Sequence, residues 1–368
     1  MKRKVHILTT YASPNSIAFL YPFLANRRFF SSHGIEFSFY ETVSKKIYSC
    51  DCLFINSKFF REWYPRQQNE LYDTMSLFKK NIGRVIWFDT TDSTGTTQFN
   101  IMPFVDRYYK GQLLRNRSLY EKAFYGHRIF TDYYHERFGI EDDRAAGGQA
   151  DLTEATATTL KKEYAAKLYL SWSSAMNEWG SYNYTYGGLL AKIKCHLPFE
   201  MPYRVKFVKP DKRRSNDVLG RIGLAHKRDT VRYQRELITK ALDKNFKTNT
   251  AKISRKEYLR EIKNSKIGVS PFGLGEISCR DFEVIINGAL LYKQDMSHLE
   301  TWPPLYKDEK TYVSFAWDLS DFEYKLRTLL KDEDRIIRIS KESQRTYEYY
   351  LYGDGRLEFC DKVMDILK

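Results

Sequence analysis

Strand-like and helix-like patterns of apolar residues alternate along the first 140 residues of the chain. Segments 15–30 and 66–80 carry apolar side chains at helical spacing. Before, between and after these segments, strands are predicted at the apolar runs 4–11, 35–41, 52–57 and 84–92. Several of these runs are continuously apolar, which is typical of parallel strands covered on both faces by helices. The pattern therefore predicts a Rossmann-like first domain.

The segment from Ile140 to Met201 interrupts this alternation. It begins polar and glycine-bearing, becomes alanine-rich and helical in pattern, and then passes into a stretch dense in Tyr, Gly and Asn. Pro198, Pro202 and Pro210 follow. We expect a mobile loop and connecting helices near a domain junction.

A second alternation of strands and helices begins near Val218. Strands are predicted at 220–228, 266–271, 289–294 and 311–315. Helices are predicted at 230–243, 254–264, 280–287 and 319–330, the second of which begins with the capping box of Ser254 and Glu257. The tail from 332 onwards is helical in pattern and is expected to cross back onto the first domain.

The fold class that follows is α/β, with two Rossmann-like domains facing each other across a cleft. We place the first domain at residues 1–200, the second at 201–345, and the returning helix at 346–368. In open α/β sheets, ligands bind at the carboxyl ends of the strands. The candidate site is therefore sought in the loops that follow the predicted strands.

The most informative of these loops is a glycine turn in the second domain. Gly273 and Gly275 follow an apolar run. Glycine lets the backbone approach a ligand closely and point N–H groups at a phosphate. A helix predicted to begin near Ser278 would direct the positive end of its dipole at the same place.

Three charged side chains adjoin this turn. Arg280, in the first helical turn, can hold a diphosphate in a bidentate fork. Glu283 lies three residues further on the same helix face and can accept two hydrogen bonds from a ribose diol. Glu276, in the loop, can accept a hydrogen bond from a sugar hydroxyl. These residues predict a nucleotide-sugar site; the alternative is two acids that favour the helix dipole, with Arg280 as their surface partner.

Residues 270–299 and 312–330 resemble the C-terminal domain of GT-B glycosyltransferases, most of all the group 1 glycosyltransferases and their exostosin-like relatives. The shared pattern is a strand, a glycine loop, Ser-x-Arg-x-x-Glu and a Gly-small-apolar strand. It corresponds here to Ser278, Arg280, Glu283 and residues 288–291. The resemblance covers the 268–330 segment, whereas the N-terminal half is similar to the family only in its alternation.

This resemblance implies roles for several residues. Glu283 would bind the ribose of the donor, and residues 273–276 would lie against its sugar and phosphates. The group 1 retaining enzymes usually have seven residues between the two glutamates, whereas six separate Glu276 from Glu283 here. The role of Glu276 and the stereochemistry of transfer therefore stay open.

Basic residues near the start of the second domain are further candidates for donor binding. In GT-B enzymes the first strand and loop of this domain commonly supply Arg or Lys to the donor pyrophosphate, which corresponds here to Lys227 or Arg228. Fixed cations are needed there when no metal stabilises the leaving group; the alternative is a solvated basic face. His298, after the last strand of the motif, is a candidate contact of the donor base or sugar, with a structural histidine as the alternative.

Asp89 and Asp92 are the candidate catalytic bases. They follow an apolar run and lie in a loop of small hydroxyl residues, 87–100. A base must accept the acceptor proton if the configuration inverts, whereas Asp in such loops also commonly caps turns. The nearby Asp106, Arg107 and Lys110 are candidate contacts of the acceptor or of a phosphate; the alternative is that they are surface residues.

Charge and composition indicate which kinds of ligand and surface the protein could bind. The net charge of +14 favours acidic partners, and residues 204–235 hold eleven Lys or Arg against three Asp, yet no nucleic-acid-binding motif accompanies them. The five cysteines are scattered, which is typical of a reduced, cytoplasmic protein. Residues 19–30 pair apolar rings with Arg27 and Arg28, as in a core helix or in a surface that rests on an anionic membrane.

We therefore expect a cytoplasmic glycosyltransferase, peripheral at the inner face of the plasma membrane, that needs neither metal nor cofactor. Its donor would be a nucleotide sugar, and its acceptor a glycan or lipid-linked intermediate of bacterial surface polysaccharide synthesis; no nucleic acid partner is expected. Three alternatives remain: another sugar-processing enzyme on the same fold, a nucleic-acid binder that uses residues 204–235, and a small-molecule-binding module on a periplasmic-binding-like fold.

Overall fold

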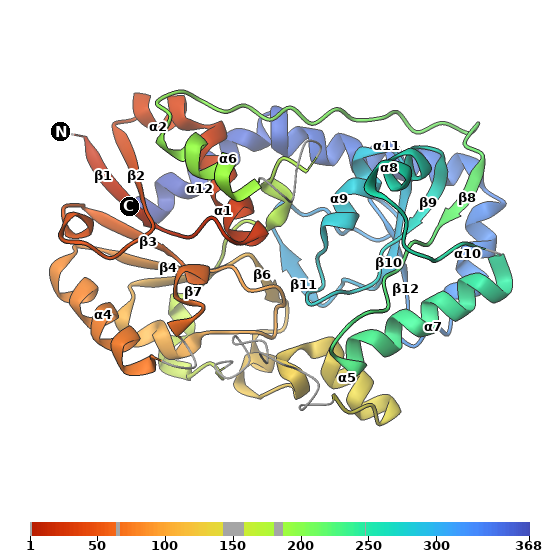
Figure 1. Cartoon of the computed structure of the whole chain (residues 1–368), viewed down its shortest axis with the longest axis horizontal. Helices are drawn as coiled ribbons and strands as arrows, with labels where there is room; N and C mark the ends of the chain where they lie inside the picture. Colours follow the sequence, from red (N-terminus) through yellow and green to blue (C-terminus); the bar gives the residue numbers. More distant parts are fainter. Residues whose placement is uncertain (1, 64–66, 143–157, 180–186, 247) are drawn as a thin grey trace.

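The computed structural model describes residues 2–63, 67–142, 158–179, 187–246 and 248–368. Two parallel β-sheets stand side by side, and long C-terminal helices run behind both (Figure 1). No helix within the described residues is both long and apolar enough to cross a membrane.

The first sheet has six strands in the order β2-β1-β3-β4-β5-β7, and every neighbouring pair is parallel. Every residue of β3 and β4 is buried, as expected for strands covered on both faces. The strands are β1 (Arg3–Leu8), β2 (Ile35–Tyr40), β3 (Cys52–Asn56), β4 (Val85–Asp89), β5 (Arg107–Lys110) and β7 (Leu168–Leu170). The helices of this half include α1 (Pro14–Ala25), α2 (Arg27–Ser32), α4 (Gln68–Asn81), α5 (Ile129–Phe138) and α6 (Gly187–His196).

The second sheet has four strands in the order β12-β10-β9-β8, again parallel throughout. Its apolar core contains buried side chains from the strands and from α7 and α10. The strands are β8 (Asn216–Leu219), β9 (Ser265–Val269), β10 (Leu290–Gln294) and β12 (Val313–Phe315). The helices of this half are α7 (Asp229–Phe246), α8 (Arg255–Lys263), α9 (Cys279–Ile286) and α10 (Phe322–Leu330).

Two further features join the halves. β6 (Gln112–Leu114) pairs antiparallel with β11 (Leu299–Thr301), so one small sheet has a strand from each half. The helix α11 (Glu333–Tyr352) leads from the second sheet to α12 (Gly355–Leu367), whose buried side chains Phe359, Val363 and Ile366 share a core cluster with the first sheet. Both chain termini consequently lie at the first sheet (Figure 1). This confirms the predicted fold class: two Rossmann-like halves of the GT-B kind, with a returning C-terminal helix.

In the second half, one prediction made from a local sequence signal is confirmed and another is wrong. The capping box of Ser254 and Glu257 is present at the start of α8. The strand predicted at 220–228 is wrong, because the edge strand β8 lies just before it and the chain leaves the sheet at Gly220. A Cβ at Gly220 would come within 2.7 Å of the Leu242 side chain, so α7 packs directly against the backbone where the strand ends.

The region between the halves also differs from expectation. The alanine-rich stretch forms a short 3-10 turn, Lys162–Lys167, followed by β7, instead of a longer helix. Most of the predicted mobile loop and of the Tyr-rich stretch, residues 143–157 and 180–186, lies outside the described residues. Residues 16–25 are all buried, so of the two interpretations of the 19–30 segment the core helix is confirmed.

Candidate functional site

The carboxyl ends of the two sheets meet at the glycine turn that follows β9. A Cβ at Gly275 would overlap the backbone carbonyl of Asp92, so this close approach of the two halves requires glycine. Glu276, which is fully buried, accepts hydrogen bonds from Ser93 Oγ (3.0 Å) and Thr94 Oγ1 (2.5 Å). Its second oxygen faces Thr94 N (3.2 Å) and Gln112 Nε2 (3.3 Å). The sequence predicts that Glu276 contacts a sugar; in the structure its carboxylate instead joins the two halves.

The helix α9 begins directly after this turn, at a buried ionic network. Asp281 forms a capping box with Ser278 and accepts a hydrogen bond from Ser270 Oγ (2.5 Å). The Lys293 ammonium lies 3.2 Å from the Asp281 carboxylate, and both side chains are fully buried. Tyr306 Oη also donates to Asp281, at 2.8 Å. The network fixes the first turn of α9 against β10, and with it the direction in which the helix dipole points.

Two arginines lie beside this helix start. The Arg235 guanidinium donates to the carbonyls of Phe272 (2.9 Å) and Gly223 (2.7 Å), and a Cβ at Gly273 would lie 3.5 Å from it. Burial lowers the pKa of Arg235 to about 10, and the charge of Arg280 contributes to this shift. Among the described residues, no carboxylate pairs with Arg235 or with Arg280. Two positive charges therefore lie close enough to influence each other, with no neutralising acid in the part of the chain that the structure describes.

Two further cations complete the set. Arg128, from the first half, is fully buried and donates from Nε to the Leu274 carbonyl (2.6 Å) in the glycine turn. Burial lowers the pKa of Lys293, and the charges of Arg235 and Arg280 lower it further, against the opposing effect of Asp281. We call Arg128, Arg235, Arg280 and Lys293 the cation cluster. Fixed cations, a helix N-terminus and glycine backbone in one place make a site suited to a diphosphate.

The pKa of His226, in the loop before α7, is affected by the positive charges of this region. Burial lowers its pKa to about 4, and the charges of Arg235 and Arg128 contribute. An unfolded histidine titrates near pH 6.5, so the unfolded chain binds more protons between these values. We therefore expect the free energy of unfolding to fall as the pH is lowered from 6.5 towards 4. Substitution His226→Gln should make this fall smaller.

Urea unfolding at pH 7 and pH 5 measures this effect. The exposed His33 provides the control, and His33→Gln should leave the wild-type pH dependence unchanged. Equal loss of stability in wild type and His226→Gln would show that His226 does not sense the cluster.

Lys227 and Arg228, the predicted phosphate contacts, are placed differently. Arg228 pairs with Asp142 of the first half at 3.2 Å, and Asp142 also accepts from the backbone N of Thr230 (2.8 Å), at the start of α7. Lys227 is exposed and has a partner of its own. Arg235, further along α7, lies at the glycine turn instead, because 220–228 is a loop and not a strand that would end there.

Arg235 was missed in the sequence, although a signal for it exists. Arg228, Arg232 and Arg235 are spaced by four and three residues, which places them along one face of a helix. If α7 is predicted to begin at Asp229, Arg235 lies on the same helix face as Arg232 and becomes a candidate site residue. Arg128 had no comparable local signal, because it comes from the other half of the chain.

Glu283 lies one turn after Arg280 on α9, as predicted. Its side chain is 6% exposed and pairs with Arg255 at 2.9 Å. His298 packs edge-on against Trp317, with ring centroids 4.9 Å apart. Both of its ring nitrogens are buried without a hydrogen-bond partner among the described residues. Burial lowers the pKa of His298, while the charge of Glu276 opposes the shift, so His298 lies near the contact between the halves.

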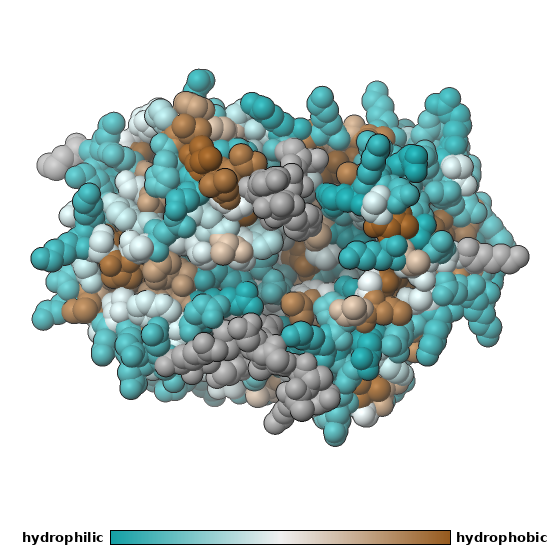
Figure 2. Space-filling view, viewed as in Figure 1, coloured by the Kyte–Doolittle hydropathy of each residue, from teal (hydrophilic) through white to brown (hydrophobic). Residues whose placement is uncertain are grey.

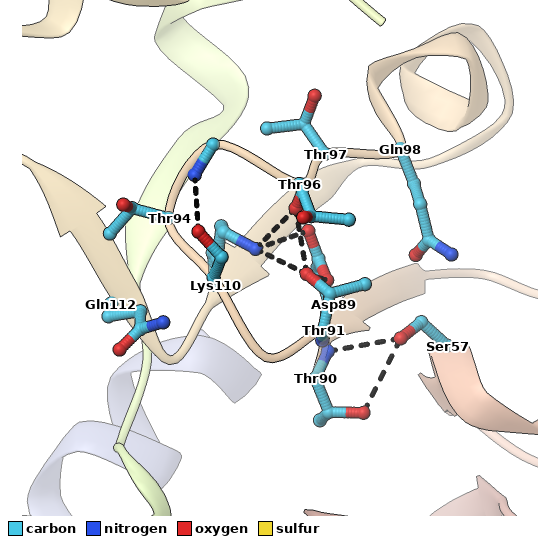
Figure 3. Close-up of polar contacts among 12 residues, drawn as sticks. Ser57, Asp89, Thr90, Thr91, Thr94, Thr96, Thr97, Gln98, Lys110 and Gln112 are labelled. Carbon is cyan, nitrogen blue, oxygen red and sulfur yellow. Dashed lines mark hydrogen bonds and ion pairs between the residues drawn. The ribbon is translucent and has the colours of Figure 1, made fainter. Parts of the chain in front are cut away.

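The two candidate bases have different environments. Asp89 is 1% exposed and pairs with the buried Lys110 at 2.9 Å (Figure 3). It also accepts a hydrogen bond from Tyr108 Oη at 2.5 Å. Thr91 donates to Asp89 as well. Burial lowers the pKa of Lys110, and Asp89 opposes that shift. Asp89 is thus held in a buried network, although it also lines the small cavity next to Asp92, and its role as the base stays a prediction.

Lys110 also differs from the prediction. It was expected to be a surface residue or an acceptor contact, and it is a core residue. The other two charged candidates of this segment lie away from the site: Asp106 pairs with Lys79 and accepts from the backbone N of Val85 (2.8 Å), and Arg107 lies by Tyr109. A charged residue at the end of a strand is ambiguous in sequence, because its burial depends on a partner from another strand.

Asp92 is the accessible candidate. Its side chain is 37% exposed and lies 3.9 Å from Lys58 Nζ. It lines a cavity of about 60 Å³ together with Gln112 and Trp172 of the first half and Ile277 of the second. This carboxylate therefore faces a space between the two halves, close to the glycine turn. Within the described residues, His, Cys, Asp and Glu side chains form no group of three placed to hold a metal ion.

Fold and site together define a GT-B-like protein with a cluster of cationic side chains at the carboxyl end of its second sheet. Solved structures similar over the whole chain include an alpha-glucosyltransferase in complex with UDP and DNA, with 10% identity, coverage of 100% of both chains and a TM-score of 0.47. Anabaena HepE in complex with UDP-glucose has 7% identity, coverage of 98% of this chain and 99% of the other, and a TM-score of 0.47. A Rickettsia africae glycosyltransferase has 9% identity, coverage of 100% and 99%, and a TM-score of 0.46.

No protein-family model and no curated protein sequence matches the chain. The assignment of the fold rests on the chain itself: two parallel sheets whose carboxyl ends face each other and a C-terminal helix that returns to the first sheet.

Proposed function

We propose that this chain is a glycosyltransferase that takes a sugar from a nucleoside-diphosphate donor. The observation that carries the proposal is the cation cluster, in which Arg235 and Arg280 lie beside the start of α9 without a carboxylate partner among the described residues. A diphosphate would neutralise these charges and accept hydrogen bonds from them. The same groups would stabilise the charge that develops on the leaving nucleotide during transfer.

The remaining residues suit the other parts of the reaction. Glu283, one helical turn after Arg280, would exchange its bond to Arg255 for the ribose hydroxyls of the donor. Asp92 would accept the proton of the attacking acceptor hydroxyl, since it is accessible and faces the space between the halves. Glu276 would keep the two halves in register through Ser93 and Thr94. In this scheme the fixed cations supply the charge that a metal supplies in other transferases.

Binding of the donor provides the test. Thermal denaturation should be recorded with UDP-, GDP-, ADP-, TDP- and CMP-linked sugars and with the corresponding free nucleotides. We expect at least one nucleotide sugar to raise the melting temperature, because a ligand that binds the native state stabilises it by an amount that grows with the logarithm of its concentration above Kd. Failure of every nucleotide and nucleotide sugar to stabilise the protein at millimolar concentration would contradict the proposal.

Substitution Arg280→Ala should weaken binding of the stabilising nucleotide by about 10- to 100-fold, the range expected for the loss of a charge-assisted hydrogen bond. Calorimetric titration measures the change. Arg327→Ala is the matched control, since Arg327 is half-exposed on α10 and pairs with Glu323. Equal affinities of wild type and Arg280→Ala would remove Arg280 from the site.

We further propose that the acceptor is a glycan or lipid-linked intermediate of bacterial surface polysaccharide, presented at an anionic membrane face. The support comes from α6, because residues 19–25 are core. Ala191 and Cys195 of α6 are buried, whereas Leu189, Leu190 and Ile193 are 62%, 47% and 50% exposed. Figure 2 shows the resulting apolar patch. An exposed apolar helix face with lysines beside it suits the interface of an anionic bilayer.

Co-sedimentation with vesicles tests this docking. Leu189→Ser/Ile193→Ser should reduce binding to vesicles of phosphatidylglycerol and phosphatidylethanolamine by about tenfold, since each large apolar side chain contributes about 1.5–3 kcal/mol when fully buried and less at an interface. The control is Leu357→Ser, a 41% exposed leucine on α12. Undiminished sedimentation of the double variant would exclude α6 as the docking surface.

Nucleic acid is not favoured as the partner of residues 204–235. Many of the basic side chains in this segment are already paired within the chain, and Arg214 donates to the backbone carbonyls of Ser265 and Asn287. Within the described residues, carboxylate partners are seen for Lys212, Arg213, Arg221, Arg228 and Arg232.

A further inference from the structure

A second, larger cavity lies away from the cation cluster and from Asp92. It has a volume of about 890 Å³ and opens between the β7 edge of the first sheet, the segment that follows β11, and α12. It shares no lining residue with the small cavity at Asp92. Because three separate parts of the fold form its walls, it is a groove at a junction, where binding sites preferentially occur.

Aromatic rings line this groove. Tyr169, on the edge strand β7, is 40% exposed, and its ring stacks on Tyr109 at 5.2 Å between centroids. Trp302, after β11, packs edge-on against Tyr350 and beneath Lys362, whose Nζ lies 5.6 Å from the centre of its ring. A cation lies over each of the two rings, so each ring is held in place with a polar group against it. That combination suits the C–H faces and hydroxyls of sugar rings.

The charges of the groove indicate which ligands it suits. Four carboxylates and four cations line it, so that the two signs balance, and burial lowers the pKa of Lys362. The carboxylates are Glu300, Glu358, Asp361 and Asp365, and the cations are Arg107, Arg115, Lys307 and Lys362. A polyanion such as nucleic acid would meet four like charges here, whereas an uncharged chain of hydroxyl groups finds donors and acceptors along the whole groove.

We propose that this groove binds an uncharged oligosaccharide, as a site for a glycan segment remote from the transfer centre. This inference rests on the proposed function, because the groove would hold part of the acceptor or product chain of a glycosyltransferase while the reacting end of that chain lies in the cleft. Tyr306 connects the two places: it lines the groove, and its hydroxyl donates to Asp281, the capping residue of α9.

Direct binding of defined sugars tests the groove. Maltohexaose, cellohexaose, xylohexaose, mannohexaose and chitohexaose should each be titrated into the full-length protein, with saturation-transfer NMR and calorimetry as readouts. We expect at least one hexaose to bind. Tyr169→Ala and Asp361→Asn should each weaken that binding about three- to tenfold, as expected for loss of one stacking or polar contact. Both positions are exposed, which favours normal folding of the variants.

The control is Tyr324→Ala, since Tyr324 is a 75% exposed aromatic residue on α10, outside the groove. Its substitution should leave hexaose affinity unchanged. Absence of binding by all five hexaoses, or binding that neither groove variant weakens, would overturn the proposal. Nucleotide binding is measured in the same variants and should stay at the wild-type level. If no hexaose binds but a nucleotide does, this inference fails and the proposed function stands. If a hexaose binds but no nucleotide does, the proposed function fails and the groove remains a sugar site.

Discussion

Substitution Asp92→Asn should lower kcat of sugar transfer by about 10²- to 10⁴-fold, the usual contribution of a positioned general base. An amide keeps the size of the carboxylate but cannot accept the proton of the acceptor hydroxyl. Asp92 is the accessible one of the two candidate acids and lines the cavity between the halves. The affinity for the donor nucleotide should change little, because the cation cluster is untouched.

Steady-state kinetics with the donor identified by thermal denaturation would measure this effect, together with calorimetry of the nucleotide. Asp243→Asn is a suitable control, since Asp243 is exposed on α7. Its kcat should equal that of the wild type. Retention of more than about a third of wild-type kcat by Asp92→Asn, far above the range for a lost base, would show that another group accepts the proton.

Substitution Lys293→Met should destabilise the protein by about 3–5 kcal/mol, the range for breaking a buried ion pair by removing one partner. Lys293 and Asp281 are both fully buried and 3.2 Å apart. Without the ammonium, the Asp281 carboxylate keeps its hydrogen bonds from Ser270 and Tyr306 but has no counter-charge. The free energy of unfolding from urea titration measures the loss.

The double variant Lys293→Met/Asp281→Asn should recover part of that stability, because the buried site is then neutral and the amide oxygen can still accept hydrogen bonds. Lys325→Met gives the surface comparison: Lys325 pairs with Asp321 at 2.8 Å but is about one-third exposed, so its loss should cost less than about 1 kcal/mol. If Lys293→Met were as mild as Lys325→Met, the network beneath α9 would not hold the site in place.

Periodicity and local motifs predicted the fold well, because they depend on residues that are near in sequence. Continuous apolar runs such as β3 and β4 are typical of a parallel sheet covered on both faces. The start of α9 near Ser278 follows from its capping box and the preceding glycines. The edge strand β8 was misplaced, since a short edge strand has few apolar residues to mark it.

The site was predicted less completely, because its geometry depends on contacts between distant residues. Arg280 and the glycine turn could be found from one short stretch. The burial of Asp89 could not, since it depends on Lys110 of the next strand. Glu276 has its partners more than 180 residues away, in Ser93 and Thr94. A charged side chain near a strand end can belong to a ligand site or to a buried network, and the sequence pattern is the same in the two cases.

The most direct measurement of the central claim compares a nucleoside diphosphate with its monophosphate in wild type and in Arg280→Ala. The cation cluster should make the wild type bind the diphosphate more tightly, since the second phosphate adds charge and acceptor oxygens. In Arg280→Ala this preference should shrink by about tenfold or more, while affinity for the monophosphate changes less. An undiminished preference for the diphosphate in the variant would contradict the placement of the donor phosphates at this cluster.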